Sequence, residues 1–271
     1  MKTRILAAAA LLPVLLVVIL VLPAVGTAVL VGVMAAIGAY ELLFGTGLVR
    51  EPRLIAYTAV MSLLVSLWSH FGMDYAPALL GILVFCGILY GEVLHSRAKL
   101  PFVSVTVCLA GGLLIPFLLS ALVRIRSSEN GRFLILLPFV LAFLSDTGAY
   151  FAGCFLGKHK LAPTISPKKT VEGVIGGVIA AVLGMVLYCL ILNSAFGFQV
   201  NYLYAVLYGI LGSGTAVFGD LCFSAIKRQV GIKDYGNLIP GHGGVLDRFD
   251  SMTLVAPLAE ALLLLLPVAV K

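Results

Sequence analysis

The sequence predicts an all-α polytopic membrane protein with about nine transmembrane helices. Of its 271 residues, 61% are hydrophobic and only 11% are charged, whereas about a quarter of a typical soluble domain is charged. The mean hydropathy is +1.13, and long stretches of the chain contain no charged residue. Because a spanning helix needs about 20 mostly apolar residues, we expect one integral membrane domain over residues 1–271.

The charge-free stretches define the expected helices. Residues 5–40 and 173–219 each have room for two helices, so we expect a turn near Pro23 in the first and near Asn193 in the second. Residues 5–22 form an apolar stretch after Lys2 and Arg4, a pattern also found in cleaved signal peptides. Because a second apolar helix follows at once, we expect residues 5–22 to be retained in the protein. The expected spans are 5–22, 25–44, 54–70, 76–94, 102–123, 133–153, 173–192, 202–223 and 252–270.

The basic residues predict the orientation. With nine spans, the side that carries the amino terminus holds fourteen of the eighteen Lys and Arg residues, and the other side holds Arg124, Arg126, Arg132 and Lys271. The positive-inside rule makes the richer side cytoplasmic. The formal net charge of +6 therefore reflects topology, and nucleic acid is not an expected partner. We expect an integral membrane protein whose active site faces the cytoplasm.

Polar residues are concentrated in the carboxy-terminal half. Residues 1–125 are interpreted as a helical scaffold, and residues 126–271 as a catalytic region with cytoplasmic loops 154–172 and 224–251. Glu41 and Glu92, near helix ends in the scaffold, are expected to reach water. The five cysteines stand singly, with no CxxC or Cys/His cluster, so neither a zinc site nor a disulfide framework is expected.

Residues 224–250 hold three carboxylates and four basic side chains beside apolar helices. Because charged groups are costly to place beside a membrane, this concentration indicates a function. Asp220, Ser224 and Lys227 have the i, i+4, i+7 spacing of one helix face, and Asp247 and Asp250 have i, i+3 spacing. A glycine-rich loop between them lets the two helix ends come together. Converging carboxylates favour Mg²⁺, which prefers oxygen ligands. The alternative is a salt-bridge network of Asp247 and Asp250 with Arg248 or Lys227.

Two further motifs fit a phosphate-bearing ligand. The Gly241-His242-Gly243-Gly244 turn precedes a helix start, where backbone N–H groups bind anions, although such turns also serve as hinges. His242 either donates to a phosphate or satisfies a local backbone group. The Ser166–Gly173 segment places Lys168, Lys169 and hydroxyls before a helix; an ordinary positive-inside flank is the alternative.

Asp146 falls well inside the sixth expected span, where an ionised side chain costs several kcal/mol unless it is paired or hydrated. We therefore expect it to line the same polar cavity as Asp220, Asp247 and Asp250, either as a metal ligand or as a nucleotide contact. No serine–histidine–acid arrangement and no reactive cysteine is visible in the sequence, which disfavours acyl transfer and thiol chemistry. Phosphoryl or nucleotidyl transfer is favoured instead, because metal ions and basic side chains supply most of what it needs.

The segment from Ser224 to Asp250 resembles the signature of the phosphatidate cytidylyltransferases, also called CDP-diacylglycerol synthases. Asp146-Thr147-Gly148-Ala149-Tyr150 and Ser166-Pro167-Lys168-Lys169-Thr170 with Glu172-Gly173 are similar to two other motifs of that family, which often has tryptophan where this chain has Val171. The resemblance extends over the chain, although it is weak in residues 1–125. It implies that CTP and phosphatidate give CDP-diacylglycerol and pyrophosphate, with Mg²⁺, a second cation assigned in the family as K⁺, and a homodimer.

The site residues combine the motifs with this resemblance. The residues expected in catalysis are Asp220, Lys227, Arg228, Asp247 and Asp250, and the resemblance implies that Asp220, Asp247 and Asp250 hold the metals. The residues expected to bind substrate are Asp146, Ser166, Lys168, Lys169, Thr170, Ser224, Lys233, Asp234, His242, Gly243, Gly244 and Arg248. Two other functions remain open: a CTP-dependent lipid kinase, which would need a base for a neutral hydroxyl, and a cation-coupled transporter, against which no internal repeat is visible.

Overall fold

A computed structural model describes residues 13–72, 74–97, 99–239, 241 and 243–271. Seven helices in this part of the chain are long and apolar enough to cross a membrane. The chain is therefore an all-α polytopic membrane protein, as predicted. Residues 5–12 of the first expected span, together with Lys2 and Arg4, lie outside the described residues.

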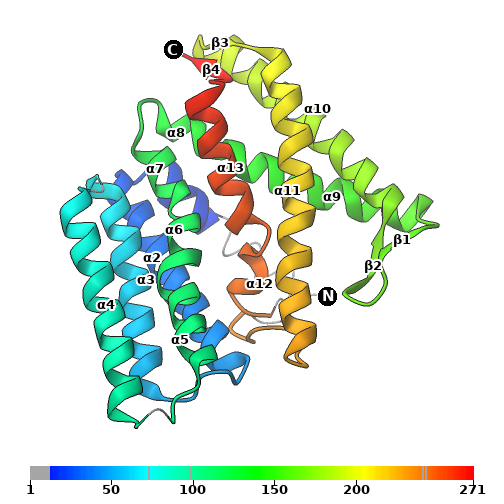
Figure 1. The fold of residues 1–271 in the computed structure, drawn as a ribbon. Helices are drawn as coiled ribbons and strands as arrows, with labels where there is room; N and C mark the ends of the chain where they lie inside the picture. The colour runs from blue at the N-terminus through cyan, green and yellow to red at the C-terminus, as the bar shows by residue number, and fades with distance from the viewer. Residues whose placement is uncertain (1–12, 73, 98, 240, 242) are drawn as a thin grey trace. The chain divides into compact units, whose positions relative to one another are not determined.

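The chain divides into two compact units. The first unit comprises residues 1–127 and 234–248, and the second comprises residues 128–233 and 249–271. The predicted signature segment is shared between them, because residues 224–233 belong to the second unit and residues 234–248 to the first. Figure 1 shows the elements of both units.

The first unit is a bundle in which α2 packs against α3, α6 and α7. Buried serines join its helices: Ser62 Oγ donates to the Gly111 carbonyl at 2.8 Å and Ser120 Oγ to Ser66 Oγ at 3.0 Å. Two π-helical turns interrupt the bundle, a feature that often marks functional sites. Its elements are α2 (Ala24–Tyr40), η1 (Glu41–Gly45), α3 (Pro52–Phe71), α4 (Tyr75–His95), α5 (Phe102–Leu109), η2 (Ala110–Leu114), α6 (Ile115–Leu119) and α7 (Ala121–Ser127).

The second unit is organised around α9, α10 and α11. Small residues allow α9 and α10 to approach closely, since a side chain at Gly148 would collide with Ala180 and one at Gly176 with Ala152. The buried hydroxyls of Ser145 and Ser213 join α9 to α11 at 2.7 Å. The elements are α8 (Gly131–Leu134), α9 (Leu136–Leu156), β1 (Lys160–Ala162), β2 (Ser166–Thr170), α10 (Val171–Phe196), β3 (Gln199–Val200), α11 (Tyr202–Gln229), α13 (Met252–Leu265) and β4 (Ala269–Val270).

Three features differ from the expectation of helices alone. The loop at 154–172 forms an antiparallel hairpin of β1 and β2, and β3 pairs with β4. The helix expected over 252–270 ends at Leu265, because Pro267 cannot continue it. The short helix α12 (Leu246–Phe249) is separate from α13.

Candidate functional site

The carboxylate of Asp220 contacts two other polar side chains near the end of α11. Its Oδ1 accepts a hydrogen bond from Ser224 Oγ at 3.0 Å, which confirms that these residues share a helix face. Its Oδ2 lies 2.7 Å from Lys169 Nζ. Lys169 comes from β2, so the hairpin brings a basic side chain to this carboxylate, a contact that the helix spacing alone does not predict.

Asp250 belongs to the same group of charges. Burial raises the pKa of its carboxyl from 3.8 to about 7, and the negative charges of Asp220 and Asp146 act in the same direction. Lys227 and the Ser251 amide partly oppose the shift. Asp146, on α9, is exposed, and Lys227 is buried, with 7% of its surface accessible. Within the second unit, the charges of Asp220 and Asp146 therefore both act on the Asp250 carboxyl.

The raised pKa of Asp250 predicts how stability depends on pH. The carboxyl binds its proton more tightly in the folded chain than in the unfolded chain, where its pKa is near the ordinary value of 3.8. Stability is therefore lost as the pH rises from about 4 through about 7. We expect the thermal unfolding midpoint of the metal-free protein in detergent to fall over this range. The fall in the unfolding midpoint should be smaller in Asp250→Asn than in the wild type. Equal falls in the two proteins would contradict a raised pKa at Asp250.

The hairpin also contacts the end of α11 through Arg228. Its Nε donates to the Ile165 carbonyl at 3.2 Å, and Nη1 donates to the Ile232 carbonyl at 3.1 Å. Arg228 therefore joins the two predicted cytoplasmic loops within the second unit. Among the other hairpin residues, Lys168 is exposed and Ser166 is half-buried. Thr170 is buried and caps α10, because its Oγ1 accepts from the Gly173 amide at 3.1 Å.

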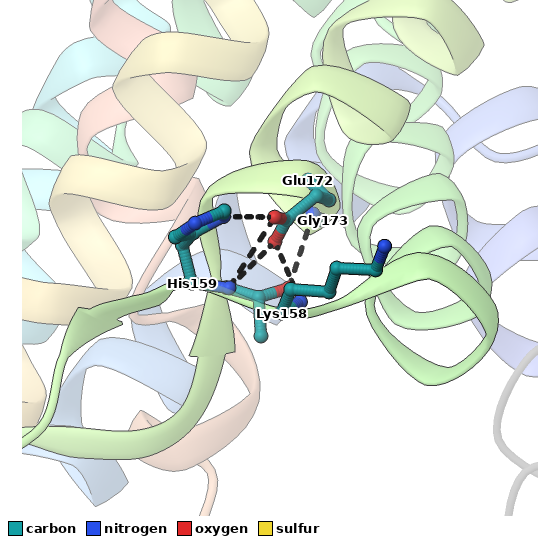
Figure 2. A network of polar contacts seen from close by, with 5 residues as sticks. Lys158, His159, Glu172 and Gly173 are labelled. Carbon is teal, nitrogen blue, oxygen red and sulfur yellow. Dashed lines mark hydrogen bonds and ion pairs between the residues drawn. The ribbon is translucent and has the colours of Figure 1, made fainter.

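Glu172 anchors the base of the hairpin (Figure 2). Its carboxylate accepts hydrogen bonds from the backbone amides of Lys158, at 3.1 Å, and His159, at 3.2 Å. The His159 ring nitrogen Nδ1 lies 2.6 Å from Oε1. Glu172 is part of the motif read from the sequence but was not among the predicted site residues. The sequence did not indicate this role, because the partners precede β1 and meet Glu172 only when the hairpin forms.

We expect Glu172→Gln to loosen the β1–β2 hairpin, because the neutral amide has one acceptor oxygen in place of two for the backbone amides of Lys158 and His159 and for the contact with the His159 ring. Hydrogen exchange at the amides of residues 158–170 should become about tenfold faster. Glu129→Gln is the matched control, since Glu129 is an exposed residue of the same unit. Unchanged exchange in Glu172→Gln would show that the carboxylate does not hold the hairpin.

In the first unit, Asp247 is buried with 5% of its surface accessible. Its Oδ2 accepts hydrogen bonds from the Tyr235 amide at 2.8 Å and the Gly244 amide at 3.0 Å. This carboxylate therefore closes the loop from Tyr235 to Asp247 on itself. Within the loop, the Ile239 amide donates to the Gly243 carbonyl at 2.9 Å, and Gly243 has a φ of +85° that favours glycine.

The expectation that Glu41 reaches water is wrong. Glu41 is only 3% exposed, and its carboxylate accepts hydrogen bonds from the amides of Val245 at 3.0 Å and Leu246 at 2.8 Å. These amides begin α12, where we expected N–H groups to hold a phosphate. The anion that they bind is a carboxylate of the protein itself, supplied by a residue about 200 positions earlier, and no local pattern indicates such a pairing.

The other predicted residues are placed as follows. Asp247 and Asp250 do not share a continuous helix face as expected, because α12 ends at Phe249, and they belong to different units. His242 lies outside the described residues. Lys233, Asp234 and Arg248 are exposed. Within either unit, the described residues include no group of three His, Cys, Asp or Glu side chains that is already arranged to hold a metal ion.

Comparison with known proteins gives a consistent result. Residues 2–266 match the family model described as the cytidylyltransferase family. The chain is 37% identical to a phosphatidate cytidylyltransferase of Staphylococcus haemolyticus over 177 residues, which are 65% of this chain and 66% of that protein. It is 42% identical to a protein of the same name from Haemophilus influenzae over 150 residues, 53% of this chain and 52% of the other.

Proposed function

Because the chain belongs to the cytidylyltransferase family, we propose that it transfers a cytidylyl group from CTP to phosphatidate, giving CDP-diacylglycerol and pyrophosphate. The observation that carries the proposal is the family match over nearly the whole chain, joined to the name shared by its relatives. A phosphate oxygen of phosphatidate forms a bond to the α-phosphorus of CTP, and the bond from that phosphorus to the β-phosphate oxygen breaks. The electron pair leaves with pyrophosphate.

Basic groups of the second unit suit the charge of these substrates. Lys169, Lys227 and Arg228 lie on or beside α11 with Ser224, and Lys169 reaches Asp220 at 2.7 Å. A phosphate nucleophile is already anionic and needs little help from a general base. The task of these side chains is to neutralise and orient phosphate groups, because phosphoryl-type transfers depend mainly on positioning and charge stabilisation.

Mg²⁺ is the proposed cofactor, with K⁺ as a second cation. The carboxylates that would hold the metals are Asp220, Asp247 and Asp250, and oxygen donors of this kind suit Mg²⁺. Burial raises the pKa of the Asp250 carboxyl and the charge of Asp220 adds to the shift; a bound cation would relieve that repulsion, which supports the fit. When bound, Mg²⁺ would neutralise charge on the triphosphate.

The setting of the reaction is also part of the proposal. We expect the active site to face the cytoplasm from a bacterial-type inner membrane, in agreement with the distribution of Lys and Arg. CTP would enter from the cytoplasm and phosphatidate from the bilayer. A homodimer is the expected assembly.

The test is pyrophosphate release by the detergent-purified protein given CTP, Mg²⁺ and phosphatidate, with diacylglycerol as the comparison lipid. Pyrophosphate and a CDP-lipid product that appear only with phosphatidate would support the proposal. CDP formed from diacylglycerol would show a lipid kinase instead. Folded protein that turns over neither lipid, but carries ions across proteoliposomes without CTP, would indicate transport.

A further inference from the structure

Glu41 is a buried carboxylate whose position is fixed by the loop that follows Asp234. It begins the π-helical turn η1 at the end of α2, and its two oxygens accept from the Val245 and Leu246 amides at 3.0 and 2.8 Å. A buried carboxylate is costly unless hydrogen bonds satisfy it. The two amide hydrogen bonds therefore offset part of the desolvation cost of this carboxyl group within an apolar helix bundle.

Glycines allow the loop to reach this carboxylate. A side chain at Gly236 or Gly244 would collide with the carboxylate of Glu41, and one at Gly45 would collide with the Tyr235 carbonyl. Three glycines from two distant parts of the chain thus keep the loop in direct contact with η1. The contact involves both ends of the loop, since Gly236 lies near its start and Gly244 near its end.

The same loop carries Asp247. Its carboxylate binds the Tyr235 and Gly244 amides at 2.8 and 3.0 Å, and the amides bound by Glu41 belong to the two residues just before it. Movement of residues 245 and 246 would therefore turn the Asp247 side chain. Two buried carboxylates, one from η1 and one from the loop, together fix the backbone that carries Asp247.

We propose that Glu41 is a positioning residue, which acts on the reaction by holding the Tyr235–Asp247 loop so that the Asp247 carboxylate keeps its orientation. This inference rests on the proposed function for its kinetic consequences, whereas its structural part stands without it. It assigns a role in the reaction to the amino-terminal region, which the sequence analysis interpreted as scaffold.

The main test uses Glu41→Gln, which keeps the size of the side chain but replaces one acceptor oxygen by an N–H donor facing a backbone N–H. We expect kcat to fall by about 10- to 100-fold, with the KM values for CTP and phosphatidate within about threefold of the wild type. In an Asp247→Asn background the same change should cost less than about threefold, because coupled residues are not additive. Folded Glu41→Gln with the kcat of the wild type would overturn the proposal.

Hydrogen exchange provides a readout that needs no turnover. Exchange at the amides of residues 235–247 should be about tenfold faster in Glu41→Gln than in the wild type, and unchanged exchange would overturn the proposal. If the wild type forms no CDP-lipid, the proposed function fails, yet this comparison still decides the role of Glu41. Glu92→Gln is the matched control, because it makes the same change on α4 of the same unit. It should alter neither kcat nor exchange.

A second variant covers the case in which Glu41→Gln does not fold. Gly236→Ala keeps Glu41 in the chain but adds a methyl group that would collide with its carboxylate. We expect faster exchange at residues 243–247 and a lower kcat, in the same direction as Glu41→Gln. Exchange and kcat equal to those of the wild type in this variant would overturn the proposal.

Discussion

Asp247→Asn is expected to lower the rate of CDP-diacylglycerol formation by about 100- to 1,000-fold. The Asp247 carboxylate is buried and binds the Tyr235 and Gly244 amides, and it is a proposed metal ligand. Replacement of one oxygen by an amide nitrogen removes the negative charge and turns one acceptor into a donor. The measurement is steady-state turnover of the purified variant at several Mg²⁺ concentrations, because loss of a ligand should also raise the concentration that gives half-maximal rate.

Asp74→Asn serves as the control for Asp247→Asn, since Asp74 is an exposed residue of the same unit that precedes α4. It should leave turnover and the Mg²⁺ requirement unchanged. A folded Asp247→Asn protein with near-normal turnover would refute the assignment of Asp247 to the metal site.

Lys169→Met is expected to lower turnover by about 100-fold. The Lys169 ammonium lies 2.7 Å from the Asp220 carboxylate, in a unit where Asp146 and Asp250 add further negative charge. Methionine has a side chain of similar length but carries no positive charge. Repulsion among the carboxylates then increases, and a phosphate group of the substrate loses a partner. Turnover at saturating CTP and phosphatidate measures the effect.

Lys160→Met tests whether the position of the charge matters. Lys160 is an exposed residue of β1 in the same hairpin, so its loss changes the net charge by the same amount without touching Asp220. We expect turnover within about twofold of the wild type. Equal losses in the two variants would mean that Lys169 contributes only to the general basic character of the hairpin.

The sequence predicted some contacts of the site and missed others for identifiable reasons. Asp220 and Ser224 are four residues apart on one helix, and their contact follows from helix geometry. The contacts of Lys169 with Asp220 and of Arg228 with Ile165 depend on a β-hairpin. The sequence predicted this segment as a cytoplasmic loop, and its short, polar strands lack the alternation of apolar residues that would indicate a sheet. The expected helix face for Asp247 and Asp250 was wrong, because α12 ends between them.

The amino-acid sequence alone is enough to predict a polytopic helical membrane protein and to indicate its family. Both properties depend on local information: charge-free stretches of sufficient length, and motifs whose residues are near one another along the chain. Only the tertiary structure decided that Glu41 is buried against the Val245 and Leu246 amides. A buried carboxylate needs hydrogen-bond donors close to it in space. Those donors can come from any part of the chain, so the local sequence does not reveal them.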